Sequence, residues 1–299
     1  MSYGQSVRAV QDALAAAGVA LTTGTVRYVR STVGINAVSS GSKPSDPYAS
    51  IDYAIGQCDA SKGDVIVVLP GHTEAITAAG GITCDVAGIT IVGIGTGRNR
   101  PTITWSTATA ATLLVTASNV TIKNIYMDMT GIDAVASGIS VTTGTDFALD
   151  GCEIEFADSG GQATLAMLTE ATADRLRITN CKFFGSADAG TAAAIRIVGG
   201  NDHVITDNVI FGNFTTTLGG IDNATTAGLR WNISRNLIAN NTASSTIAVV
   251  LQSGTTGHVT NNRFAIRSGT APVTAAGAFM GGNVYVAAAG VTAGTAATF

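Results

Sequence analysis

Six short runs with one shared pattern of apolar and polar positions recur between Val120 and Phe264. Each run has an anchoring apolar residue, and a second apolar residue follows it five positions later. Successive anchors are spaced 27, 29, 27, 28 and 26 residues apart, and they are Ile122, Leu149, Ile178, Ile205, Ile233 and Val259. A period of this length predicts a stacked array of repeated supersecondary units.

The content of each repeat favours strands over helices. A second set of strand-sized runs lies between the first, such as T-L-L-V-T (Thr112–Thr116) and A-I-R-I-V (Ala194–Val198). These runs are rich in Val, Ile and Thr, and Gly, Asn, Asp, Ala and Thr separate them. Amphipathic runs of about ten residues, which a helical array would need, are missing from the repeats. The pattern therefore predicts an all-β fold, a parallel β-helix (solenoid).

The column of residues three positions after the anchors is the most informative one. It contains Ile125, Cys152, Cys181, Asn208, Asn236 and Asn262. Neighbouring coils lie about 4.8 Å apart, so each residue is expected to contact its counterpart one repeat away. Cys152 should therefore lie against Cys181, and we interpret this pair as small buried hydrophobic residues, although they are close enough to form a disulfide. The three asparagines should form a ladder in which buried amides satisfy one another.

A short helix is predicted at the start of the chain, from Gly4 to Ala17, and Gly18 ends it. Its apolar stripe includes Val7, Val10 and Leu14. Two interpretations remain open: the stripe binds a partner through these three residues, or the helix only covers one end of the array.

A second short helix is predicted just before the first coil. Ser50 is a suitable N-cap, and Ile51, Ala54, Ile55 and Cys58 fall on one helical face. Such a helix would be a lid over the first hydrogen-bonding edges. The predicted segments are therefore a helical arm (1–27), a β-helix (28–270) and an Ala/Gly/Thr-rich C-terminal strand and tail (271–299).

Composition narrows the function classes. Only 12% of the 299 residues are charged, the net charge is −4, and Lys and Arg form no cluster, which opposes nucleic-acid binding. The sequence has no apolar run of about 20 residues, so no membrane span is predicted. The first residues lack the apolar core of a signal peptide, so synthesis in the cytoplasm is expected.

The entry to the repeats resembles a known family. The segment Y-V-R-S-T-V-G … P-Y-A-S-I-D-Y-A-I … G-D-V-I-V-V-L-P-G (residues 28–71) is similar to the entry of right-handed parallel β-helix proteins of the pectin-lyase-like type. It is most similar to versions found in structural proteins of tailed phages. The resemblance implies a right-handed solenoid, but the same scaffold carries lyases, hydrolases, phage tailspikes and inert structural proteins.

The best enzymatic candidates are Asp128 and Glu155, which the register places in neighbouring coils, with Asp133 and Asp158 in nearby turns. No Lys or Arg column flanks the pair, so these side chains are interpreted as solvated carboxylates and no catalytic residue is assigned. No metal-binding or cofactor-binding residue is assigned either. His72, His203 and His258 are isolated, and His203 and His258 should face different ways because they precede their anchors by two residues and by one.

The sequence therefore favours a non-enzymatic structural protein of a phage virion, a capsid decoration such as a head spike or cement protein. The alternative is a receptor-binding tailspike or tail fibre that contacts host surface glycans, with or without polysaccharide-cleaving activity. About 25 residues precede the entry segment and about 35 follow the last clear repeat, which leaves little room for the extra domains of a tailspike. A secreted lyase is a weaker third alternative. The expected partners are the capsid and further copies of this chain, and the resemblance implies a homotrimer.

Overall fold

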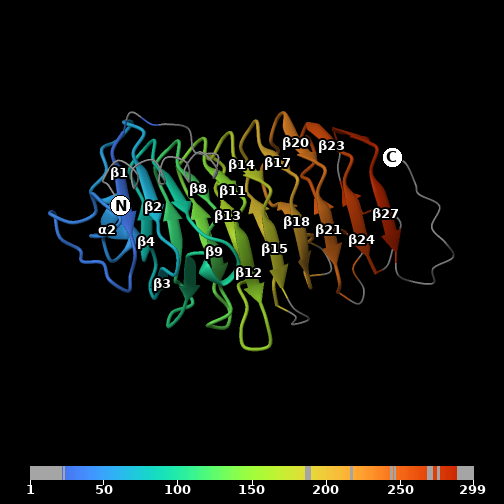
Figure 1. Ribbon diagram of the computed structural model, residues 1–299. Coiled ribbons are helices and arrows are strands. Elements are labelled where there is room, and N and C mark those ends of the chain that lie inside the picture. Colours follow the sequence, from blue (N-terminus) through green and yellow to red (C-terminus); the bar gives the residue numbers. More distant parts are fainter. Residues whose placement is uncertain are drawn as a thin grey trace.

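The chain winds into a parallel β-solenoid whose coils stack along one axis (Figure 1). The computed structural model describes residues 22, 24–185, 190–215, 218–242, 245, 247–267, 272–274 and 277–287. Each full coil contributes one strand to each of three sheets, which we call sheets 1, 2 and 3 in the order in which the chain enters them. The predicted all-β parallel solenoid is confirmed.

Sheet 1 contains the strands in which the anchor residues lie. Its strands are β1 (Val26–Val29), β2 (Val65–Val68), β5 (Thr90–Gly93), β8 (Thr121–Lys123), β11 (Ala148–Asp150), β14 (Arg177–Thr179), β17 (Val204–Thr206), β20 (Trp231–Ser234), β23 (Gly257–Thr260) and β26 (Ala278–Gly281).

Sheets 2 and 3 complete each coil. The strands of sheet 2 are β3 (Thr73–Ile76), β6 (Thr102–Trp105), β9 (Tyr126–Asp128), β12 (Glu153–Ala157), β15 (Lys182–Gly185), β18 (Val209–Gly212), β21 (Leu237–Asn240), β24 (Arg263–Ile266) and β27 (Val284–Ala287). The strands of sheet 3 are β4 (Ile82–Cys84), β7 (Leu113–Val115), β10 (Ile139–Val141), β13 (Leu165–Thr169), β16 (Ala193–Ile197), β19 (Ile221–Asn223), β22 (Val249–Val250) and β25 (Val273–Thr274).

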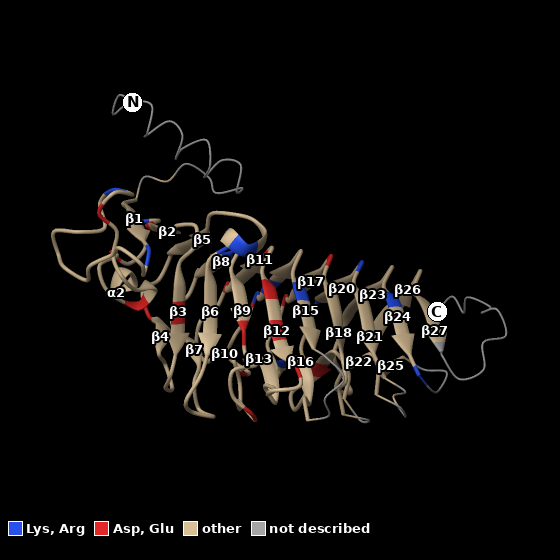
Figure 2. Ribbon diagram, turned by 60° about the horizontal axis from the view of Figure 1, so that its bottom comes forward, with Lys and Arg blue, Asp and Glu red and all other residues tan. Residues whose placement is uncertain are grey.

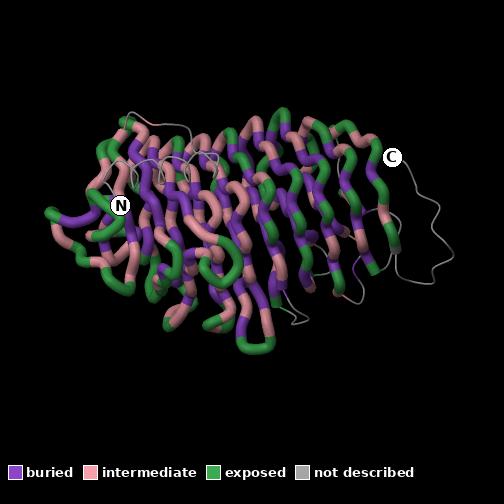
Figure 3. Tube along the Cα trace, viewed as in Figure 1, coloured by how far each residue is buried: buried purple, intermediate pink, exposed green. Residues whose placement is uncertain are grey.

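The predicted register is confirmed. Leu149 pairs with Ile122 on one side and with Ile178 on the other, and the other anchors continue the same column. All six anchors are buried, and inward and outward positions alternate along the strands, as the burial colours of Figure 3 show. This alternation follows from the two-residue period of a strand, and it leaves one outward column or two on each strand.

The corner between sheets 1 and 2 is a turn of two residues that is repeated in successive coils. Its first residue has a left-handed backbone, with φ between 52° and 65°, at Asn124, Gly151, Asn180, Asp207, Arg235, Asn261 and Gly282. Gly, Asn and Asp adopt this conformation most readily, and they fill six of the seven positions.

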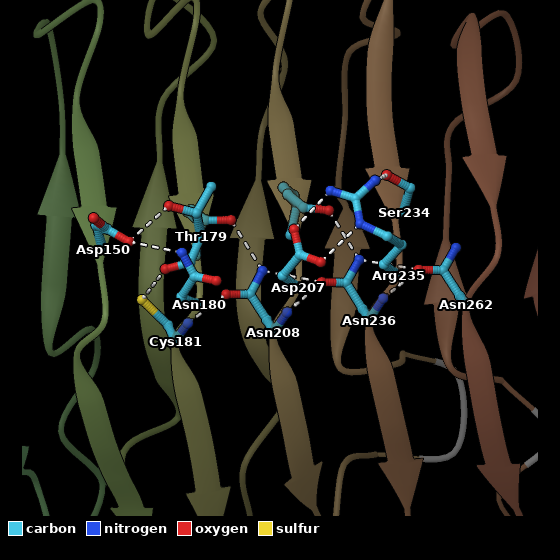
Figure 4. A network of polar contacts seen from close by, with 12 residues as sticks. Asp150, Thr179, Asn180, Cys181, Asp207, Asn208, Ser234, Arg235, Asn236 and Asn262 are labelled. Atoms are coloured by element: carbon cyan, nitrogen blue, oxygen red, sulfur yellow. Dashed lines mark hydrogen bonds and ion pairs between the residues drawn. The ribbon is translucent and has the colours of Figure 1, made fainter.

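The second residue of this turn points into the solenoid and forms the predicted ladder (Figure 4). Asn236 Nδ2 donates to Asn262 Oδ1 at 3.0 Å and to the carbonyl of Ile205 at 2.8 Å. Asn236 Oδ1 accepts from the backbone N–H and the side-chain amide of Asn208, both at 3.0 Å. The ladder starts at the backbone N–H of Cys181 and extends one coil further than predicted, to Asn283.

The cysteines of this column lie in adjacent coils, as predicted, and both are free. The Cys181 thiol points at the carbonyls of Leu149 and Thr179, and burial raises its pKa. A thiol of this kind is a poor nucleophile, because the thiolate is the reactive form.

The N-terminal end of the solenoid is covered by α2 (Ile51–Ile55), which packs against β1, β2 and β4. Ser50 is its N-cap, as predicted, and accepts from the N–H of Tyr53. The helix is shorter than its sequence pattern indicates, because it ends before Cys58. One turn of 3₁₀-helix, η1 (Gly97–Asn99), lies in the loop before β6. The helix predicted at Gly4 to Ala17 lies outside the described residues.

The sheets continue past residue 270, where the C-terminal segment was predicted to begin. Strands β25, β26 and β27 pair with β22, β23 and β24, and β27 contains most of the extra strand predicted at Val284–Ala289. The repeat pattern weakens there because the spacing from Asn262 to Asn283 falls to 21 residues.

Candidate functional site

The predicted carboxylate pair lies on the outward face of sheet 2. Asp128 on β9 and Glu155 on β12 occupy register positions beside each other, and both are half-buried. Two carboxylates beside each other on one face are the usual starting point for acid–base chemistry, so their hydrogen-bond partners decide what they can do.

Glu155 is held by Tyr126, whose hydroxyl donates to Oε2 in a short hydrogen bond. Burial and this hydrogen bond both raise the pKa of Tyr126. The tyrosine therefore stays protonated and remains a donor to Glu155 over the physiological pH range.

Asp128 is held by the turn that follows β9. Its Oδ1 accepts from the backbone N–H of Thr130 at 3.0 Å and from the Thr130 hydroxyl at 2.6 Å. Asp158 makes the same kind of contact with its own turn, through the N–H groups of Gly160 and Gly161. Asp133 is exposed in the loop after β9. These contacts define turns and do not bring the four carboxylates to one point.

A third carboxylate, Glu153, joins this face. Its Oε2 accepts from Arg100 at 3.1 Å, and its Oε1 accepts from Lys182 at 3.0 Å. The pairing of Glu153 with Lys182 on adjacent coils was predicted, and so was that of Lys123 with Asp150, which is also observed.

The pairing of Glu153 with Arg100 was not predicted, and it corrects the expectation that no basic residue flanks the carboxylates. Arg100 lies in the loop between η1 and β6, so column spacing could not find it. Together with Arg98, Tyr126 and Phe184 it lines a shallow groove of about 450 Å³ over the acidic part of sheet 2.

Sheet 3 contains a second charged pair that sequence analysis missed. Arg196 on β16 donates to Asp222 on β19 at 2.6 Å, and the Asp222 side chain is only 2% exposed. A carboxylate this buried depends on a charge-assisted hydrogen bond to offset its lost hydration. The signal was present, because aligning the runs A-I-R-I-V and G-G-I-D places these residues beside each other.

Three further ion pairs connect exposed turns of neighbouring coils, and each arginine donates two hydrogen bonds to its aspartate. The pairs are Arg175 with Asp146, Arg230 with Asp202, and Arg235 with Asp207. The hydrogen bonds from arginine lower the pKa of all three aspartates. These pairs are solvent-exposed, so each contributes little to stability.

The three histidines lie in separate environments. His72 and His203 are buried, whereas His258 on β23 is exposed, so His203 and His258 face different ways as predicted. Among the described residues, no three His, Cys, Asp or Glu side chains are grouped so that they could hold a metal ion.

The C-terminal half of the same outward face of sheet 2 is apolar. Five of its side chains are large, hydrophobic and 40–53% exposed, and they are Val209, Phe211, Leu237, Val284 and Val286. Figure 2 shows how few charged residues this half carries. Phe211 was placed at or beside a core column by sequence, and the structure turns it outward, whereas Phe183 is in the core. We call these five side chains the apolar strip.

The predicted partner-binding residues Val7, Val10 and Leu14 lie outside the described residues. In the part of the chain that the structure describes, no helix is long and apolar enough to cross a membrane.

Comparison with known proteins identifies the family. A search of curated proteins finds no match. Among solved structures, the chain is similar to the pectate lyase Pel9A at 15% identity and a TM-score of 0.45, over 91% of this chain and 83% of that one. It is also similar to a rhamnogalacturonan lyase (13% identity, TM-score 0.36, over 82% and 76% of the two chains) and to ORF18 of Geobacillus virus E2 (13%, 0.32, over 79% and 57%).

These structural similarities are too distant to transfer an activity. The family model of the right-handed β-helix region, in contrast, matches residues 103–285, which is more than half of the chain. The matched residues include the anchor columns, the asparagine ladder and the outward face of sheet 2. The chain therefore belongs to the right-handed β-helix family.

Proposed function

We propose that this protein is a non-enzymatic structural component of a phage virion, and specifically a decoration protein of the capsid. The apolar strip is the observation that carries the proposal, because a contiguous group of exposed hydrophobic side chains is suited to a protein partner. The resemblance of the entry segment to structural proteins of tailed phages supports the phage context.

The chemistry of the carboxylates also supports a structural role. Glu155 is held by Tyr126, Asp128 by Thr130, and Glu153 by Arg100 and Lys182. A general acid or base must reach a substrate proton, and these oxygens are already engaged with the protein itself.

Attachment to the particle is proposed to use the helical arm, through Val7, Val10 and Leu14, and the protein is proposed to be a homo-oligomer. Deleting residues 2–18 is expected to leave the β-helix folded, because its sheets are formed by residues 26–287. The deleted protein should be absent from purified particles, as measured by cryo-electron microscopy and by mass spectrometry of particle proteins.

The same images test the location. Density on the capsid surface supports the decoration role, and density only on the tail overturns it. Particles that retain the truncated protein at full occupancy would contradict the anchor and leave the helix as a cover for the solenoid.

A second candidate function is that of a receptor-binding tailspike that cleaves a host polysaccharide. It is favoured by one observation: Tyr126, Glu153 and Arg100 line a single groove, with Glu155 hydrogen-bonded to Tyr126. Carboxylates beside a tyrosine and a cation are groups that glycan-cleaving enzymes use.

The double variant Asp128→Asn, Glu155→Gln decides between the two candidates. We expect purified protein to cleave no acidic or capsular polysaccharide, and we expect the double variant to assemble into particles like the parent. Asp133→Asn, in the exposed loop beside β9, is the matched control. Reproducible cleavage by the parent and by Asp133→Asn, lost in the double variant, would establish the enzymatic alternative.

A further inference from the structure

The outward face of sheet 2 carries two columns of side chains that change in character along the solenoid. One column contains the first residue of each strand from β9 to β27, and the other contains the third. The first column is Tyr126, Glu153, Lys182, Val209, Leu237, Arg263 and Val284, and the second is Asp128, Glu155, Phe184, Phe211, Ala239, Ala265 and Val286.

The two ends of this face have opposite charge. The end at β9 and β12 holds three carboxylates, and Arg100 and Lys182 offset two of them. The end at β24 and β27 holds Arg263, which is exposed, and Arg267 follows directly after β24. No Asp or Glu lies between Glu170 and the end of sheet 2 on this face, so the charge of the C-terminal end is wholly positive.

The face also has a hollow and a projection. A groove of about 280 Å³ lies over Ala239 and Ala265, and Phe211 and Val286 are among the residues that line it. Two strands before β21, on β15, Phe184 stands outward with the Lys182 ammonium 4.7 Å from its ring centre. A face that carries both an aromatic projection and an aromatic-sized groove is able to be complementary to itself.

We propose that a second copy of this chain binds face to face on sheet 2, with the two solenoids antiparallel. The two-fold axis lies in the contact plane and runs along β18, so that the order of the coils is reversed between the copies. In such a contact the same patch serves both copies, and each interaction occurs twice.

This axis brings complementary groups together. Strands β12 and β24 each lie two strands from β18, so Arg263 faces Glu153 of the second copy. Strands β15 and β21 each lie one strand from it, so Phe184 enters the groove over Ala239 of the second copy. Phe211 lies on the axis and contacts its own counterpart, which removes the most exposed aromatic residue of the face from water.

A parallel arrangement, in which each coil meets the same coil, loses these matches. Arg263 would then face Arg263 of the second copy, and the three carboxylates would face their own counterparts. Like charges beside each other disfavour association and so select against this geometry. The groove over Ala239 would also face another groove and remain unfilled.

The contact is small, so the pair is expected to be reversible. Seven strands about 4.8 Å apart and two outward columns give a band of roughly 300 Å² in projection. A standard stable interface buries about 800 Å² on each partner, so dimers should dominate only at high protein concentration.

The inference rests on the proposed function in one respect, since both treat this face as a contact surface and not as a substrate site. It differs from the trimer that the family resemblance implies, because a two-fold axis through Phe211 closes the assembly at two copies.

Sedimentation velocity of the purified full-length chain, over about a hundredfold range of concentration, tests the pairing. The parent should shift from monomer to dimer, and added salt should weaken the dimer because the charges of Arg263 and Glu153 become screened. Phe211→Lys places two cations on the axis and should raise the dissociation constant at least about tenfold. The control is Phe279→Lys, which changes an exposed aromatic residue on β26 of sheet 1 and should leave the dimer intact.

Cross-linking tests the antiparallel register. A mixture of Phe184→Cys and Ala239→Cys proteins should form a mixed disulfide dimer under a mild oxidant, whereas neither protein alone should cross-link. The parent is the blank for its own four cysteines, of which only Cys58 is partly exposed. Efficient self-cross-linking of either single variant would indicate the parallel arrangement and overturn the inference, as would a trimer or a monomer at every concentration.

The outcomes for the two proposals are separable. Absence of dimers from solution refutes the pairing and leaves the location on the particle as a separate measurement. Polysaccharide cleavage by the parent refutes the structural role, and the dissociation constant of the pair is measured without reference to it.

Discussion

His203 is a buried histidine whose hydrogen bonds fix it in the neutral form. The backbone N–H of Leu176 donates to Nδ1 at 3.1 Å, so the ring proton is on Nε2, which donates to the carbonyl of Gly199 at 2.9 Å. A second ring proton would point at the N–H of Leu176. Trp231 packs on the ring at 4.8 Å. Burial lowers the pKa of His203, and the nearby Asp174 and Asp202 only partly counteract it.

This environment predicts a loss of stability at mildly acidic pH. The unfolded chain takes up a proton on His203 near its ordinary pKa of about 6.5, whereas the folded chain does so only at lower pH. Between these values the unfolded state binds more protons, so stability falls as pH decreases below about 6.5. The melting temperature of the parent should drop between neutral pH and about pH 5.5, and His203→Gln should reduce this pH dependence.

His258→Gln is the control, because this exposed histidine should not change the slope. The paired aspartates do not interfere, because their lowered pKa values place their contribution below about pH 3.9. An unchanged slope in His203→Gln would show that another group causes the acid sensitivity.

At the scale of the element, the two-residue turn between sheets 1 and 2 is where sequence analysis was most accurate. The anchors, the second apolar column and the ladder column were all assigned correctly, because inward positions tolerate few residue types and so keep a visible period. The left-handed column two positions after the anchors was missed, although Asn, Gly and Asp are frequent in it. Asn283 was missed because its coil is shorter than the others.

The ladder gives a sharp prediction for Asn236→Asp. The substitution replaces Nδ2, which donates to Ile205 and Asn262, with an oxygen that faces two other oxygens. Either the new carboxylate is charged and buried, or it takes up a proton and loses one of the two donated bonds. The expected loss of unfolding free energy is about 3 kcal/mol, measured by urea denaturation.

Asn232→Asp is the matched control, because it makes the same chemical change on the outward side of the same strand, where Asn232 is half-buried. It should change the urea midpoint little. Equal midpoints for the two variants would mean that Asn236 is not held in an interior ladder.

At the scale of the whole molecule, the surface was the part that sequence could not predict. Column spacing finds neighbours in adjacent coils, but Arg100 reaches Glu153 from a loop 53 residues earlier, and loop paths have no period. Outward positions were recognised as weakly charged, yet their division into an acidic end and an apolar, basic end of sheet 2 depends on the register of seven successive strands. The deletion, cleavage and pairing experiments described above all address this face or the arm.

The stacking of coils also determines how the chain can fold. Each strand pairs only with the coil before it and the coil after it, so hydrogen-bonded partners such as Ile122 and Leu149 are 27 residues apart wherever they lie. The loop-closure entropy of a pairing step is set by that separation and not by the length of the chain. Folding can therefore start between any two neighbouring coils and grow in both directions, one coil at a time. A longer solenoid of this design would need more such steps, but none of them would be slower than the first.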